Sequence, residues 1–387
     1  MKKFKIILII LPIFLLCGCY GKNELDDLAY VIAIGVDKLS GDNNKEVLAT
    51  YQVALPVKLI GENTDTGKDV FTTFTVQAKS LDEANSKINS LASKELNLSH
   101  TKMILYSEEL AKESLEGHIN SFLSNPNVRP KTIISICKGK AKDFLENITP
   151  VLETSPARYY ELILSSFNYT GRLAATEILN FYVNSKADYK SPIAIMSELT
   201  ENDEGKFGGL AVFRNEKMVG EIDEELVVCH LILTGTLSKN IITIDDIEDS
   251  TKTLTLTLKQ SKKPKIDVNI KDNVPYIDIN AFLDVHLESN GGNTEYLKQE
   301  NKDKLNVILS EKITKHLYEY LDKTTELAVD PSGFGRYAKV KCLTYPQFKE
   351  YNWPEIYKNS KFTVKTNIDL NVAQIVSHSI PKLEDSN

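Results

Sequence analysis

The sequence predicts an α+β fold with several β-sheets, each flanked by helices: a mixed N-terminal sheet and a mainly antiparallel C-terminal sheet packed by one long helix. Three observations predict this class. Short apolar runs alternate with amphipathic stretches as far as residue 186. Strictly alternating segments such as 253–258 follow, which is typical of half-solvated antiparallel strands. From 305 to 321, Leu or Ile occupies every fourth position, which predicts a long helix covering a sheet.

In the N-terminal region, runs of apolar and β-branched residues predict five strands, over 28–36, 47–55, 70–78, 101–106 and 131–137. Ser80 and Ser107 are candidate N-caps of two helices, and Glu83 completes a capping box with Ser80. A further helix follows Gly139, and the stretch 150–186 is predicted to be helical, beginning at Pro156. These elements form the region 19–200, for which we expect two subdomains.

The polar, acidic segment 198–206 predicts the boundary of a C-terminal domain, 201–387. The turn residues 214–217 predict a hairpin between strands 207–213 and 218–221, and a helix is predicted over 222–233. Three further strands are predicted over 253–258, 263–270 and 276–287. The long helix is predicted over 294–325, and a last strand over 361–372.

The first residues predict a secreted, lipid-anchored protein. Three lysines precede an apolar run, 6–16, of about 16 Å as a helix, which is too short to span a hydrocarbon core of about 30 Å. Residues 1–18 therefore resemble a signal peptide. Leu16-Cys17-Gly18-Cys19 has the form of a bacterial lipobox, in which Cys19 would receive the lipid and become the new N-terminus. An ordinary signal peptide followed by a chance cysteine is the alternative.

Composition and motifs argue against several classes of function. The chain has 387 residues and a formal net charge of −7, which disfavours a broad nucleic-acid interface. The later cysteines, Cys137, Cys229 and Cys342, form no CxxC pair, and the first two lie in apolar runs typical of buried cysteines. The six histidines form no metal-binding pair, and neither a GxSxG elbow nor a P-loop occurs. We therefore predict no enzyme activity, cofactor or metal site.

Aromatic residues crowd near the C-terminus, around the chain's only tryptophan: Phe334, Tyr337, Tyr345, Phe348, Tyr351, Trp353 and Tyr357. They either fix an irregular segment onto the core or form a patch that faces a partner, since Trp and Tyr dominate interface hot spots. The glycine-rich stretch 332–336 follows a helix rather than a strand, which disfavours a phosphate cradle. A turn that needs positive φ explains Gly333 and Gly335 better.

Five blocks, in order, resemble the Ger(x)C family, the lipoprotein C subunits of GerA-type spore nutrient germinant receptors. Cys19 is followed by Glu24-Leu25-Asp26-Asp27-Leu28-Ala29 and then Val31-Ile32-Ala33-Ile34-Gly35-Val36-Asp37. The other blocks lie at Ser99–Ala111, Thr149–Tyr160, Gly209–Gly220 and Asp330–Trp353. Tyr20 stands where the family often has Trp, and Pro331-Ser332 stands at positions that are usually apolar.

The resemblance implies a non-enzymatic lipoprotein, anchored on the outer face of the spore inner membrane. Its implied partners are the membrane itself, through lipid on Cys19, and two integral-membrane receptor subunits of the A and B type. Nutrient binding is attributed mainly to the permease-like partner, and no catalytic residues are implied. The rival hypothesis is a solute-binding lipoprotein of a transporter, which predicts two similar lobes around a cleft. A third, an anchored enzyme, lacks the usual catalytic motifs.

Overall fold

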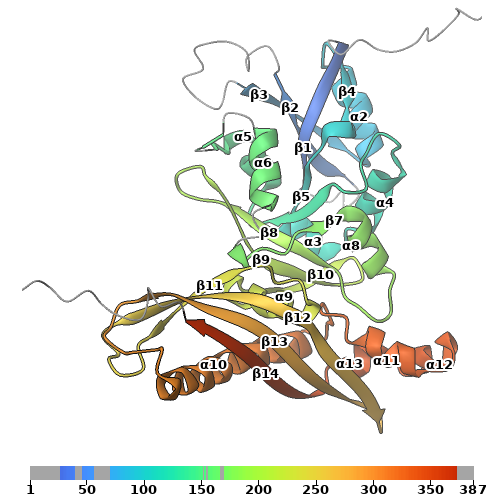
Figure 1. Ribbon diagram of the computed structural model, residues 1–387. Coiled ribbons are helices and arrows are strands. Elements are labelled where there is room, and N and C mark those ends of the chain that lie inside the picture. Colours follow the sequence, from blue (N-terminus) through green and yellow to red (C-terminus); the bar gives the residue numbers. More distant parts are fainter. Residues whose placement is uncertain are drawn as a thin grey trace, which may run out of the picture.

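The computed structural model describes residues 27–39, 46–55, 70–150, 152–153, 156–165 and 170–372. Two sheets form the centre of the molecule, one of ten strands and one of four, each with flanking helices (Figure 1). The predicted α+β class is confirmed. The predicted signal peptide and Cys19 lie outside the described residues.

The larger sheet is mixed, as predicted. Its main path runs β10-β9-β8-β6-β5-β1-β2-β3, with β4 paired to β1 and β7 to β6. β1 pairs antiparallel with β2 and parallel with β5. The strands are β1 (Leu28–Lys38), β2 (Val47–Ala54), β3 (Phe71–Ala78), β4 (Glu95–Asn97), β5 (Met103–Ser107), β6 (Ile133–Cys137), β7 (Thr176–Glu177), β8 (Ile193–Leu199), β9 (Gly205–Arg214) and β10 (Lys217–Ile222).

The hairpin β9–β10 therefore belongs to this larger sheet, so the sheet includes residues on both sides of the boundary predicted at 200. The hairpin itself was predicted, and its bounds are close to those expected. β9 pairs antiparallel with β8, and Ile193 lies opposite Val212.

Helices pack around the larger sheet: α2 (Leu81–Asn89), α3 (Glu108–Glu113), α4 (Glu116–Ser124), α5 (Ala141–Asn147), α6 (Pro156–Ser165) and α8 (Ile178–Ser185). Both predicted serine caps are confirmed: Ser80 accepts a hydrogen bond from Glu83 N, and Ser107 accepts one from Leu110 N. The single helix predicted after Ser107 is wrong, because the backbone is extended at Ser114 and separates α3 from α4.

The smaller sheet runs β11 (Asn240–Asp245), β12 (Thr253–Lys271), β13 (Val274–Asn290) and β14 (Lys361–Val372). It is mainly antiparallel, as predicted, and only β13–β14 is parallel. The two strands predicted over 253–258 and 263–270 form the single strand β12, which keeps pairing with β13 through register shifts between Gln260 and Lys265. The long helix α10 (Gln299–Glu326) lies along the sheet, where Thr314 Oγ1 is 2.8 Å from Thr366 Oγ1.

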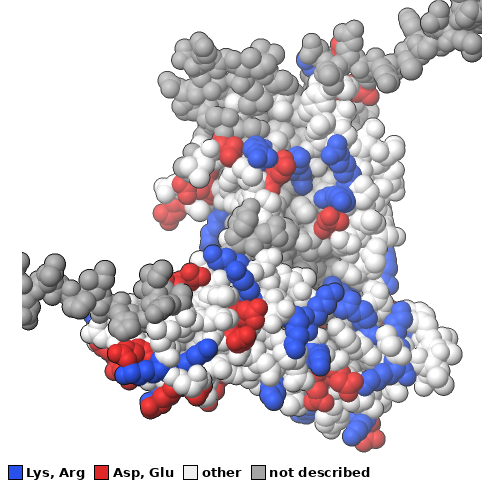
Figure 2. Space-filling model, viewed as in Figure 1, with Lys and Arg blue, Asp and Glu red and all other residues white. Residues whose placement is uncertain are grey.

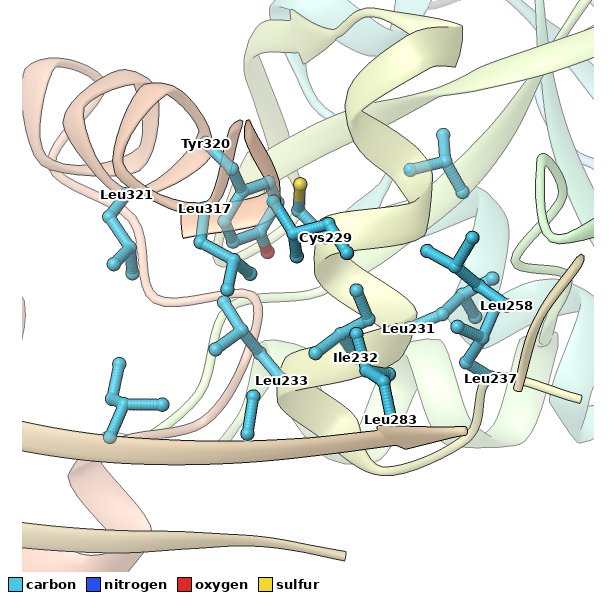
Figure 3. Packing of buried hydrophobic residues seen from close by; sticks show 14 of the residues in the cluster. Cys229, Leu231, Ile232, Leu233, Leu237, Leu258, Leu283, Leu317, Tyr320 and Leu321 are labelled. Atoms are coloured by element: carbon cyan, nitrogen blue, oxygen red, sulfur yellow. The ribbon is translucent and has the colours of Figure 1, made fainter. Parts of the chain in front are cut away.

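Between the sheets lies α9 (Val227–Thr234), preceded by η5 (Glu224–Leu226). Figure 3 shows Cys229, Ile232 and Leu233 of α9 among side chains from α10 and the smaller sheet. The same hydrophobic cluster includes Ile193 and Val212 of the larger sheet, so the core crosses from one sheet to the other. None of the helices in the described ranges combines the length and the apolar character needed to span a bilayer.

Candidate functional site at the junction of the two sheets

Asp330 organises the segment that follows α10. Its carboxylate accepts hydrogen bonds from the backbone N of Gly333 (2.7 Å) and of Gly335 (2.8 Å). A third comes from Nε1 of Trp353 (3.0 Å). Asp330 is only 3% exposed. One side chain thus holds both the turn before α11 (Gly335–Lys341) and the single tryptophan at the start of α13 (Trp353–Tyr357).

The two glycines of this turn are needed for different reasons. Gly333 has φ +76, a left-handed conformation that suits glycine, as predicted. For Gly335 the prediction is wrong, since it is the first residue of α11 and its φ is not positive. Close packing explains it instead: an added Cβ would lie 2.6 Å from Trp353 Nε1 and 2.7 Å from the carbonyl oxygen of Tyr189.

The same turn is tied to the N-terminal region just before β8. Ser191 N donates to the Asp330 carbonyl oxygen (2.8 Å), and Asp330 N donates to Ser191 Oγ (3.0 Å). A Cβ added at Gly333 would lie 3.2 Å from Cδ of Lys190, so this side chain leaves little room for a larger residue there. Arg214 of β9 also donates to the carbonyl oxygen of Leu327 (3.4 Å). The C-terminal turn and the larger sheet are therefore joined by backbone as well as side-chain contacts.

A second buried polar chain runs beside Asp330. Nδ1 of His230, on α9, is 2.9 Å from the hydroxyl of Tyr320, on α10, and that hydroxyl is 2.9 Å from Ser332 Oγ. Ser332 thus finds a polar partner inside the protein. Thr324 Oγ1 lies 2.9 Å from the hydroxyl of Tyr357. These contacts satisfy polar atoms that burial would otherwise leave unpaired.

Burial dominates the electrostatics of the junction. It raises the pKa of Asp330 to about 6, against the hydrogen bonds from Gly335, Trp353 and Gly333 that favour the carboxylate. It lowers the pKa of Lys190, and the nearby Asp330 charge opposes that change. Burial, together with the Lys190 charge, lowers the pKa of His230 to about 3, so the imidazole is neutral in the folded protein. The arrangement holds α9, α10 and the turn in one geometry.

The structure divides the predicted aromatic cluster. Phe334, Trp353 and Tyr357 come together in the interior, with ring centroids of Trp353 and Tyr357 5.8 Å apart. Tyr337 is half-buried. Tyr345, on α12 (Tyr345–Glu350), is 43% exposed and donates to the carboxylate of Asp188. Figure 1 shows α11 and α12 projecting from the side of the molecule.

Sequence reasoning did not select Asp330, Ser191 or His230 as site residues. The usable signal for Asp330 was its place before a Gly-Phe-Gly turn, where an aspartate commonly accepts backbone N–H groups. No local signal links it to Trp353 or Ser191, which lie far away in sequence. Across the described ranges, no three His, Cys, Asp or Glu side chains come together as a metal site.

Comparison with known proteins places the chain in a family. One family model, "Spore germination protein N-terminal domain", matches residues 21–199, and a second, "Spore germination B3/ GerAC like, C-terminal", matches residues 208–372. The chain belongs to the Ger(x)C family of spore germination proteins. The resemblance seen in the five sequence blocks is therefore confirmed.

Individual relatives named as spore germination proteins agree with this assignment. The chain is 22% identical to "Putative spore germination protein YfkR" of Bacillus subtilis (strain 168), over 94% of this chain and 95% of that protein. It is 27% identical to "Spore germination protein KC" of the same organism, over 38% of this chain and 36% of that protein. The solved "Crystal Structure of the GerBC protein" shares the fold, with a TM-score of 0.56 at 16% identity over 90% of this chain and 99% of that one.

Proposed function

We propose that this Ger(x)C protein is a lipid-anchored, non-catalytic subunit of a spore nutrient germinant receptor, needed for receptor assembly and germination signalling. Lipid on Cys19 holds it to the outer face of the spore inner membrane, where it contacts integral-membrane subunits of the A and B type. The observation that carries the proposal is the pair of consecutive family matches, which together cover nearly all of the chain after Cys19.

The junction supports a role that depends on contact rather than on chemistry. Asp330 and His230 are enclosed, and their hydrogen bonds go to groups within the protein. Such a network keeps the two sheets in a fixed relation, which suits a subunit that passes on a mechanical or conformational signal.

The exposed part of the aromatic segment is the surface we propose for contact with a receptor subunit. Leu343, between α11 and α12, is 95% exposed, and Val340 and Tyr345 are exposed beside it. Apolar side chains that project in this way suit a protein interface. Phe334, Trp353 and Tyr357 have a structural role in the same proposal, since they hold the base of the projecting helices.

The rival hypothesis, a solute-binding lipoprotein, receives less support. It expects two similar lobes, whereas one region is built on a ten-stranded mixed sheet and the other on a four-stranded, mainly antiparallel sheet. Stabilisation of the purified protein by amino acids or sugars would favour that rival.

Lipid anchoring is tested by Cys19→Ala in spores. We expect the variant to be unprocessed or released from the inner membrane, and nutrient germination to fall. Cys17→Ala is the matched control, because this cysteine leaves with the signal peptide and alanine suits its position. Unchanged membrane retention and processing of Cys19→Ala would refute the anchor.

Assembly is tested by co-purifying the A- and B-type subunits from spore membranes. We expect Leu343→Asp to reduce their recovery while the thermal stability of the protein is unchanged. Val307→Asp is the control, because Val307 is 57% exposed on α10, outside the segment that carries Leu343. Full recovery of both partners with Leu343→Asp would remove this surface from the proposal.

A further inference from the structure

A surface cavity of about 230 Å³ lies where β5 and β6 begin, and we call it the basic cavity. Its polar lining comes from three places in the chain: η4 (Leu98–His100) with the residues after it, the loop before β6, and α6. The charged or titratable side chains that line it are His100, Lys102, Arg129, Lys131 and Glu161.

Cations outnumber acids in the basic cavity. In the part of the chain that the structure describes, Arg129 and Lys131 have neither an ion pair nor a side-chain hydrogen bond. Lys102 Nζ is 3.4 Å from Glu161 Oε2, and Arg158 shares the same carboxylate at 3.6 Å. Like charges gathered in this way repel one another. This excess occurs on a chain whose formal net charge is −7.

The pKa of His100 reflects the positive charges around it. Partial burial lowers its pKa, and the charges of Arg129 and Lys102 lower it further. The ring packs edge-on against Tyr30, with centroids 5.0 Å apart.

The backbone beneath the cations is held by strand contacts. Lys102 N donates to the carbonyl oxygen of Ile32 (2.8 Å), and Ile133 N donates to the carbonyl oxygen of Lys102 (3.0 Å). Thr132 Oγ1 donates to the carbonyl oxygen of Thr101 (3.2 Å). A bound anion would therefore meet an arrangement whose backbone is already ordered.

We propose that the basic cavity binds an oxyanion group, a phosphate or a carboxylate, between Lys102, Arg129 and Lys131. Its volume is several times the roughly 30 Å³ that one water occupies, which leaves room for such a group with its hydration. Arg and Lys are the side chains that best pair with phosphate and carboxylate oxygens. The site goes beyond the proposed function, since it adds a ligand to the Ger(x)C protein itself.

The oxyanion has two possible sources, a free anion or a phospholipid headgroup. Cys19 lies eight residues before Asp27, where the description begins, and eight extended residues reach at most about 29 Å. Tyr30, which contacts His100, follows closely after Asp27. A lipid on Cys19 would therefore hold this part of the molecule near the bilayer surface. A phospholipid headgroup as the source depends on the proposed lipid anchor at Cys19. The oxyanion site itself does not depend on that anchor.

The site is tested by adding inorganic phosphate to the mature, lipidated protein in non-ionic detergent. Histidines are labelled with ¹³C, and the His100 resonance is assigned with His100→Gln. At constant ionic strength we expect a saturable shift of the His100 resonance and a rise of its pKa, because a bound anion favours the imidazolium. The double variant Arg129→Gln/Lys131→Gln should lose the shift. Glu161→Gln should strengthen phosphate binding, because it removes the competing carboxylate.

The control removes two charges from another basic cluster. Figure 2 shows that Lys and Arg side chains also gather over the lower half of the molecule, in the region of the smaller sheet. Lys262 and Lys263 of β12, in the smaller sheet, are both exposed, and Lys262→Gln/Lys263→Gln should keep the His100 shift. Equal phosphate shifts in both double variants would overturn the site. Circular dichroism checks that the variants fold.

A second experiment identifies the source of the oxyanion. The lipidated protein is placed in nanodiscs, and no phosphate is added. A His100 shift in phosphatidylglycerol discs but not in phosphatidylcholine discs, lost in Arg129→Gln/Lys131→Gln, assigns the headgroup. A shift with phosphate alone assigns a free anion, and no shift in either experiment overturns the proposal. A protein that leaves the discs contradicts the anchor, while the phosphate titration still decides the basic cavity.

Discussion

Asp330 is the residue on which most of the junction depends, because three N–H donors share its carboxylate. We expect Asp330→Ala to lower the free energy of unfolding by about 3 kcal/mol or more, since each buried donor left unpaired costs about 1–3 kcal/mol. Asp322→Ala, at an exposed position of α10, should stay within about 0.5 kcal/mol of the wild type. Urea unfolding measures both, and equal losses would contradict this role of Asp330.

His230 makes stability depend on pH. Its pKa is about 3 in the folded protein and 6.5 in the usual reference state, so the folded protein binds fewer protons between these values. The free energy of unfolding should be fully present above about pH 6.5. It should then fall, by up to about 1.4 kcal/mol per pH unit, as the pH drops toward 3.

Chemical unfolding of wild type and His230→Gln at several pH values tests this. Other groups titrate in the same range, so the informative quantity is the difference between the two proteins. That difference should shrink as the pH falls, because only the wild type must keep a buried imidazole neutral. His316→Gln, on α10, is the control. A difference that does not change with pH would show that His230 contributes no linked proton.

Elements with local signals were predicted well from the sequence. The strand predicted over 361–372 has those bounds as β14, and the hairpin β9–β10 and the long helix were also expected. Residues 240–245 were not predicted as a strand, although β11 carries Ile241, Ile242 and Ile244. The predicted gap inside β12 was wrong because pairing with β13 continues across Ser261–Pro264, a long-range effect that local alternation does not reveal.

The same distinction applies to the site. The density of aromatic residues in the sequence indicated the segment from Phe334 to Tyr357, but its packing depends on Asp330 and on the backbone at Tyr189. Trp353 lies 23 residues from Asp330, and Ser191 lies 139 residues from it. Contacts across such separations leave no periodic pattern, so a carboxylate with three donors could not be distinguished from any other aspartate after a helix.

The turn between β12 and β13 gives a prediction for that hairpin. Asp272 and Asn273 have φ +50 and +60, the conformation in which Asn-Gly or Asp-Gly is favoured. Asn273→Gly should raise the free energy of unfolding by up to about 1 kcal/mol, because glycine adopts positive φ without strain, a gain partly offset by the greater freedom of glycine in the unfolded chain. Asn280→Gly, inside β13, should lower it by about 0.5–1 kcal/mol. Thermal unfolding distinguishes the two, and destabilisation by both would contradict the turn argument.

The molecule as a whole has a core that is continuous between its two sheets. Ile193, Leu210 and Val212 of the larger sheet belong to the same hydrophobic cluster as α9, α10 and the smaller sheet. The Asp330–Ser191 hydrogen bonds close the same interface from the side. A shared core of this kind joins the unfolding of its two parts, so a division near residue 200 does not by itself make two independent folding units.

Trp353 provides the measurement, because the chain has one tryptophan and it lies in the C-terminal region. Ile193→Ala, in the larger sheet, should lower the free energy of unfolding by about 2–4 kcal/mol. The transition followed by Trp353 fluorescence should move together with the one followed by circular dichroism. Val183→Ala, at a position 51% exposed on α8, should leave both where they are. If Ile193→Ala left the unfolding transition of Trp353 fluorescence unchanged, the smaller sheet would keep its structure without the larger one. The core that the two sheets share would then contribute little to the stability of either.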